Sequence, residues 1–169
     1  MELTCYVAQM MRTVFVALAL FAGVAHADAY SSNAGKVTID IPKKWQVKAT
    51  DDLIRAASPN NQIAFALWVV DSPDLKAALG KLERELYSSV QGLRWVDKMK
   101  AVKIHKVPGT WVEGVGMSSR QTQLDILVVV AGPTPTKKGV ILMAVVDHDK
   151  LALNQKTIRS IFETLKTTK

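Results

Sequence analysis

The sequence contains few residues that support covalent or metal chemistry. Its 169 residues include one cysteine, Cys5, and three histidines. One cysteine cannot form a disulfide within the chain, which excludes the class of small secreted domains held together by disulfides. The sequence also lacks the G-x-G-x-x-G, P-loop and G-x-S-x-G patterns. It therefore predicts neither a phosphate cradle nor the nucleophile turn of a hydrolase.

Metal-donor residues are scattered along the chain. The one dense cluster is Asp147-His148-Asp149, at the end of a predicted strand. We interpret it as a solvated turn before a helix, because a metal needs several donors that converge and neighbours in a strand point to opposite faces. Ser118-Ser119 lies beside Arg120 with no histidine near in sequence. We therefore expect no metal, no cofactor and no catalytic residue, and a small hydrolase is the least favoured alternative.

Long hydrophobic runs are missing, with one short exception near the N-terminus. Val14 to Val24 is apolar, follows Arg12 and precedes Ala25-His26-Ala27. A basic residue, a short apolar core and an A-x-A site are typical of a secretory signal peptide. We predict a signal peptide over residues 1–27 and a periplasmic or secreted protein with no transmembrane segment in the mature chain. Membrane anchoring is the weaker alternative, because a span needs about 20 residues.

Two further expectations follow for the organisation of the chain. Residues 1–9 carry no cation and lie upstream of Met10 and Met11, either of which is an alternative start. Removing residues 1–27 from the 169 leaves 142, which suits one domain. We place this single α/β domain at residues 36–169, after a flexible lead-in at 28–35.

Acidic residues are outnumbered, with 15 Asp and Glu against 22 Lys and Arg, which gives a formal net charge of +7. Such a charge favours anionic partners such as lipid headgroups, an acidic polysaccharide or an acidic protein surface. The lysines are spread over several segments instead of gathering with aromatic residues on one element. We therefore predict no nucleic-acid partner.

The stretch Leu124 to Val146 predicts the centre of the fold. Residues 126–131 and 140–146 are all apolar, and the first run is rich in β-branched residues. Both faces of such strands must be shielded from water, so we expect two interior strands. The loop at 132–139 contains two prolines and ends in glycine, as a hairpin connection does.

Other elements surround this pair. Alternating apolar residues predict strands at 37–41, 53–58 and 62–70. Two more strands are predicted on either side of Pro108-Gly109, a lysine-rich one at 96–106 and a glycine-containing one at 110–119. Leucines at spacings of three and four predict a helix that Ser72 caps and that ends near Gly92. A second helix carries Ile158, Ile161, Phe162 and Leu165, with its cap at Asp149 or Asn154. Two amphipathic helices and strands that need cover on both faces predict an α+β fold, an antiparallel sheet flanked by helices in a three-layer α/β/α sandwich.

Several short motifs resemble those of one family. They are Ile41-Pro42-Lys43-Lys44-Trp45, a Ser-Pro-Asn turn, a Ser-Pro-Asp-Leu helix start and a final helix around residues 158–162. In this order, over most of residues 36–166, they are similar to the PsbP-like superfamily, which groups extrinsic photosystem II subunits, a yeast Ran-binding protein and bacterial proteins of unknown function. The resemblance implies a non-catalytic binding or assembly protein. The acidic ligand positions of the photosynthetic members have no clear counterpart here.

Tryptophans next to cations give the candidate binding surface. Trp45 and Trp95 follow a turn and a helix end, and tryptophan serves both cores and contact surfaces. The candidate surface residues are Trp45, Trp95, Lys43, Lys44, Lys98 and Lys100. The first hypothesis is an accessory or assembly factor that binds an envelope or secreted protein. The second is a basic module that associates with an anionic envelope polymer or lipid surface.

Overall fold

The computed structural model describes residues 27–168, without the side chains of Asp97 and Lys98. The predicted signal peptide lies outside the described residues, except for Ala27 at its end. Within residues 27–168, no helix is both long enough and apolar enough to span a bilayer.

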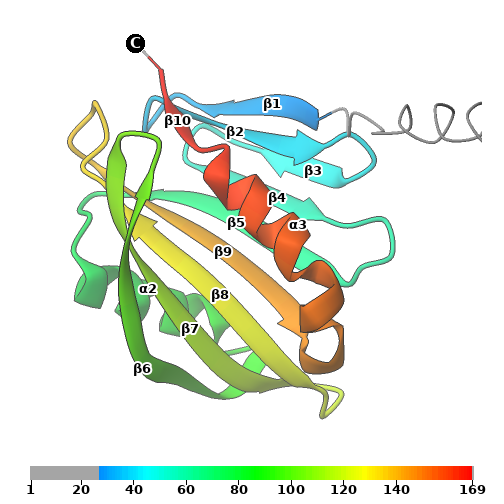
Figure 1. Ribbon diagram of the computed structural model, residues 1–169. Coiled ribbons are helices and arrows are strands. Elements are labelled where there is room, and N and C mark those ends of the chain that lie inside the picture. Colours follow the sequence, from blue (N-terminus) through cyan, green and yellow to red (C-terminus); the bar gives the residue numbers. More distant parts are fainter. Residues whose placement is uncertain (1–26, 169) are drawn as a thin grey trace, which may run out of the picture.

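A seven-stranded antiparallel sheet forms the centre of the molecule (Figure 1). The predicted interior pair is confirmed, since Leu124 lies opposite Asp147 and Ala131 opposite Val140. Every residue from Leu124 to Ala131 is buried, as expected of a strand covered on both faces. In spatial order the strands are β3 (Gln46–Ala49), β4 (Leu53–Ala57), β5 (Ile63–Val70), β9 (Gly139–Asp147), β8 (Gln123–Ala131), β7 (Val107–Ser118) and β6 (Val90–Ile104).

The two helices bury their apolar sides in two different hydrophobic clusters. Helix α3 (Leu151–Glu163) adds Ile158, Ile161 and Phe162 to a cluster that contains Leu127 and Val129 of β8. Helix α2 (Leu75–Leu86) adds Ala78, Leu79 and Leu82 to a cluster that contains Ile126 and Val128. Because successive residues of a strand point to opposite faces, β8 supplies both clusters. The α+β class with an antiparallel sheet is confirmed.

A second, three-stranded sheet lies beside α3 and changes the simple layered picture (Figure 1). Its central strand is β2 (Val37–Pro42), which pairs on one side with β1 (Ala27–Ser32) and on the other with β10 (Lys166–Thr167). Val37, Ile39 and Ile41 of β2 join the same hydrophobic cluster as α3. One sheet between two helices is therefore an incomplete description, and residues 28–32 of the predicted lead-in at 28–35 belong to β1.

The helix ends differ from the sequence predictions. Helix α2 is capped by Asp74, whose Oδ1 accepts a hydrogen bond of 2.8 Å from the backbone N–H of Ala77, while Ser72 lies outside the helix. Gly92 belongs to β6 and has a φ of +61°. Helix α3 follows the short 3-10 helix η1 (His148–Lys150), so its N-cap is Lys150 and neither Asp149 nor Asn154.

Strands β6 and β7 form a long hairpin at one edge of the large sheet. The turn lies at His105-Lys106, where His105 has a φ of +51°, and the predicted break at Pro108-Gly109 falls inside β7. The lysine-rich strand is at the sheet edge as predicted, and its pairing with β7 shifts register twice. Gly114 and Gly116 permit close packing, since a Cβ on Gly114 would lie 2.8 Å from Cε3 of Trp95.

Candidate functional site

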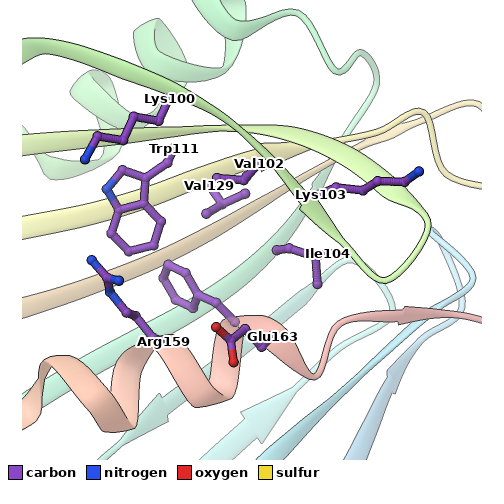
Figure 2. A pocket seen from close by; sticks show the side chains of 9 residues that line it. Lys100, Val102, Lys103, Ile104, Trp111, Val129, Arg159 and Glu163 are labelled. Atoms are coloured by element: carbon purple, nitrogen blue, oxygen red, sulfur yellow. The ribbon is translucent and has the colours of Figure 1, made fainter.

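A cleft of about 370 Å³ opens between the β6–β7 hairpin and α3 (Figure 2). Its floor is apolar, with Val129 from β8 and Phe162 from α3. The hairpin forms one wall and the helix forms the other. The remaining lining residues are Lys100, Val102, Lys103, Ile104, Trp111, Arg159 and Glu163.

Trp111 is fixed in this cleft by contacts on three sides. Its strand position directs the side chain into the cluster below α3, where it is 9% exposed. The indole Nε1–H donates a hydrogen bond of 2.8 Å to Oε1 of Glu113. The ring centroid lies 5.7 Å from that of Phe162 and 5.6 Å from the guanidinium carbon of Arg159. These contacts present one rigid aromatic surface next to a cation.

Three cations and one carboxylate belong to residues that line the cleft, with the Lys103 side chain directed away from the apolar floor (Figure 2). Lys100 and Lys103 come from β6, and Arg159 and Glu163 come from successive turns of α3. All four residues are exposed. Within residues 27–168, no ion pair joins any of the three cations to an acidic side chain. The cleft therefore combines apolar surface with a net positive rim that can receive an anionic group.

The cleft continues into a shallower hollow along the outer face of α3. Arg159 and Glu163 line both, and the hollow adds Ala152, Gln155, Lys156 and Ser160. A separate hollow at the far end of the hairpin is lined by His105, Lys106, Val107, Lys166 and Thr167. Cations thus extend from the middle of α3, past the cleft, to the tip of the hairpin.

The structure does not bring the residues of the predicted surface together. Trp45 packs against the cluster that contains α3, and Trp95 against the cluster that contains α2. Trp95 also donates a hydrogen bond of 2.6 Å from Nε1 to Oε1 of Glu83. Both tryptophans are half-buried packing residues on different sides of the large sheet.

The predicted lysines are similarly divided. Lys43 is exposed and lies 3.9 Å from Oδ1 of Asp28, and Lys44 is exposed in the turn before β3. The side chain of Lys98 lies outside the part of the chain that the structure describes. Of the five predicted residues whose side chains the structure describes, Lys100 is the one that lines the cleft.

Sequence reasoning did not identify Trp111, Arg159 or Glu163 as site residues. Trp111 lies 48 positions from Arg159 in the chain, and their proximity follows from the packing of α3 across the sheet. The sequence of α3 did contain a feature that could have pointed to the site, since the charged residues Arg159 and Glu163 lie close to the apolar Phe162 on adjacent turns. Such charged residues border the apolar side of an amphipathic helix.

In the Asp147-His148-Asp149 segment, His148 and Asp149 each contact another side chain of the protein. His148 Nδ1 lies 2.8 Å from Oδ2 of the buried Asp125. Asp149 pairs with Lys150 at 2.9 Å, and this hydrogen bond lowers the pKa of the Asp149 carboxyl and raises the pKa of the Lys150 amine. The pair is exposed, so it adds little stability. Among the described residues, no three His, Cys, Asp or Glu side chains form a group that could hold a metal.

Comparison with known proteins identifies the fold. No family model matches the sequence, and no curated protein matches it. Cyanobacterial PsbP (CyanoP) from Synechocystis sp. PCC 6803 superimposes with a TM-score of 0.64 at 10% identity, over 87% of this chain and 95% of that one. LpqN, described as involved in cell envelope biogenesis of Mycobacterium tuberculosis, gives 0.56 at 12% identity, over 85% of this chain and 91% of that one.

The yeast protein gives a similar match. The Saccharomyces cerevisiae Ran-binding protein Mog1p has a TM-score of 0.53 at 10% identity, over 85% of this chain and 96% of that one. The predicted resemblance is therefore confirmed for the fold, and the chain has the PsbP-like fold. Identities this low show the fold alone, because one fold serves many functions.

Proposed function

We propose that this protein is an exported, non-catalytic binding or accessory protein, periplasmic or secreted, that contacts an envelope or secreted protein through the cleft between β6–β7 and α3. The observation that carries the proposal is the cleft itself, in which Trp111 lies beside Phe162 and Arg159, with Lys100 on the hairpin wall (Figure 2). Aromatic residues and arginine are the residues most often found at the centre of protein interfaces.

Two further observations support binding as the function. Solved proteins with this fold include one described as Ran-binding and one described as involved in cell envelope biogenesis. The cleft volume of about 370 Å³ falls in the range of ligand-binding clefts, which is roughly 300–1,000 Å³. The signal-like N-terminus directs this binding activity to the envelope or the exterior.

Co-purification from the native envelope fraction tests the proposal. The mature protein is recovered at low and then at high salt, and the same is done for Arg159→Glu and for Lys76→Glu. Lys76 is exposed on α2, away from the cleft, so its reversal is the matched control. We expect a defined partner protein to co-purify with the wild type and with the control, and to be absent from the Arg159→Glu preparation. When that partner is purified instead, this chain should co-purify with it. Equal recovery with all three chains would contradict the proposal.

A second candidate is association with an anionic envelope polymer or lipid surface. It is favoured by the hollow at the hairpin tip, where Lys106 and Lys166 are exposed near His105. Its test is sedimentation with vesicles of phosphatidylglycerol against vesicles of phosphatidylcholine. Salt-sensitive binding to the anionic vesicles that Lys106→Glu abolishes would favour this candidate, since screening weakens exposed charges.

A further inference from the structure

We infer that the cleft binds an extended acidic peptide segment that places one large apolar side chain on the floor beside Trp111. This inference rests on the proposed function and names the chemistry of its partner. It commits to a peptide, because three properties of the site described below suit a peptide better than a lipid headgroup or a compact small molecule.

The first property is the apolar floor. Val102, Ile104 and Val129 surround the aromatic pair, and Trp111 and Phe162 are held with ring centroids 5.7 Å apart. The cleft volume of about 370 Å³ has room for a side chain the size of leucine or phenylalanine. Burial of such a side chain supplies roughly 1.5–3 kcal/mol, which a rim of charges alone does not provide.

The second property is the arrangement of charge. Lys100 lies on one wall and Arg159 on the other (Figure 2), so carboxylates on both sides of the apolar side chain find a cation. Arg159 is exposed at the boundary between the cleft and the hollow along α3. Its guanidinium can accommodate a carboxylate with two parallel hydrogen bonds.

The third property is the presence of Glu163 among these cations. Its carboxylate accepts hydrogen bonds and repels anions. A peptide can place a backbone N–H beside the Glu163 carboxylate while the acidic side chains of the peptide reach the cations. The phosphate of a lipid headgroup would meet this carboxylate with charge of the same sign.

The hollow along α3 sets the length of the ligand. It shares Arg159 and Glu163 with the cleft and adds Lys156 and Ser160. A ligand that occupies both must be elongated. An extended peptide, with side chains that alternate in direction, can place an apolar residue in the cleft and acidic residues against Lys100 and Lys156.

The test uses a fluorescently labelled short peptide with one phenylalanine between glutamates, and its binding to the mature chain is measured by anisotropy. Matched peptides replace the glutamates with glutamines or the phenylalanine with serine. We expect each replacement to weaken binding roughly tenfold, which corresponds to about 1.4 kcal/mol. We also expect the peptide to change the tryptophan fluorescence of the wild type and not that of Trp111→Phe.

Charge-reversal variants locate the binding site. Lys100→Glu and Arg159→Glu should each weaken peptide binding roughly tenfold, while Lys76→Glu should leave it unchanged. The two variants lie on different elements, so a folding defect in one, detected by its circular dichroism, leaves the other as the test. Three outcomes would overturn the inference. The glutamine peptide could bind as tightly as the glutamate peptide, or both cleft variants could bind the glutamate peptide as tightly as the wild type does. Displacement of the peptide by phosphatidylglycerol vesicles is the third.

These results separate the inference from the proposed function. A partner protein that co-purifies through Arg159 while the acidic peptide fails to bind leaves the proposed function in place and removes the peptide chemistry. Peptide binding that depends on Lys100 and Arg159, without any Arg159-dependent partner, supports the inference and contradicts the proposed function.

Discussion

His148 holds the start of the C-terminal helical segment to the large sheet through Asp125. Nδ1 of His148 lies 2.8 Å from Oδ2 of Asp125, whose side chain is 10% exposed, whereas that of His148 is 58% exposed. Asp125 belongs to β8, and His148 begins η1, directly before α3. The contact therefore fixes where α3 begins its path across the sheet, and α3 carries Arg159 and Glu163 to the cleft.

The replacement His148→Ala removes the partner of a buried carboxylate. We expect the free energy of unfolding to fall by about 1–2 kcal/mol, because a buried acceptor loses a hydrogen bond that water replaces poorly. Urea unfolding measures the change. Asp149→Ala, which removes the exposed pair with Lys150, is the matched control and should have little effect. Equal effects of the two replacements would contradict a structural role for His148.

Gly114 is required by the position of the Trp95 ring. The replacement Gly114→Ala would place a Cβ 2.8 Å from Cε3 and 2.9 Å from Cζ3 of that ring, so the indole must move away from Glu83. We expect a loss of about 1–3 kcal/mol in the free energy of unfolding, typical of overpacking. Gly80→Ala in α2 is the control, because its nearest new contact is Nη1 of Arg84 at 3.8 Å. That replacement should stabilise the protein by up to about 1 kcal/mol.

Leu82 anchors α2 and is 2% exposed. The replacement Leu82→Asp should prevent folding, because it buries a charge with no partner. Leu82→Ala should lower the free energy of unfolding by about 2–5 kcal/mol through the cavity it leaves. Calorimetry compares these variants with Leu153→Ala, since Leu153 is 77% exposed and its loss should change the melting temperature little. An unchanged melting temperature for Leu82→Asp would contradict this role.

The signal sequence makes a prediction about the mature chain. Mass spectrometry of the exported protein should show Asp28 as its first residue, because cleavage follows an A-x-A site. The replacement Ala25→Asp puts a charge where the peptidase requires a small residue, so it should leave the precursor uncleaved. Normal processing of this variant, or a mature protein that retains residues 1–27, would contradict the predicted signal peptide.

Strands stabilised by buried side chains could be predicted from the sequence, whereas strands stabilised mainly by backbone pairing could not. β8 and β9 were predicted because both faces are buried and the sequence is apolar throughout. β1 and β3 were not, because their residues are mostly exposed and little apolar patterning results. Their hydrogen-bonded pairing with β2 and β4 defines them, and such pairing between separate segments leaves little trace in one strand's composition.

The site was less predictable than the fold. Lys100 was among the predicted surface residues because it lies in a lysine-rich segment, and it does line the cleft. Trp111 resembles an ordinary core residue in sequence, and its contact with Arg159 at 5.6 Å exists only after α3 packs on the sheet. Trp45 and Trp95 share a sequence feature, a turn or helix end beside cations, but the sheet separates them.

The three-stranded sheet also leads to an expectation about how the protein responds to mechanical force. β1 and β10 both run antiparallel to β2, so they are parallel to each other. Ala27 lies at the Pro42 end of β2 and Thr167 at the Val37 end. Tension applied between Ala27 and Thr167 therefore pulls along the strand axes in opposite directions. Hydrogen bonds loaded in this shear geometry share the force, so we expect the six-residue pairing of β1 with β2 to outlast the two-residue pairing of β10 with β2.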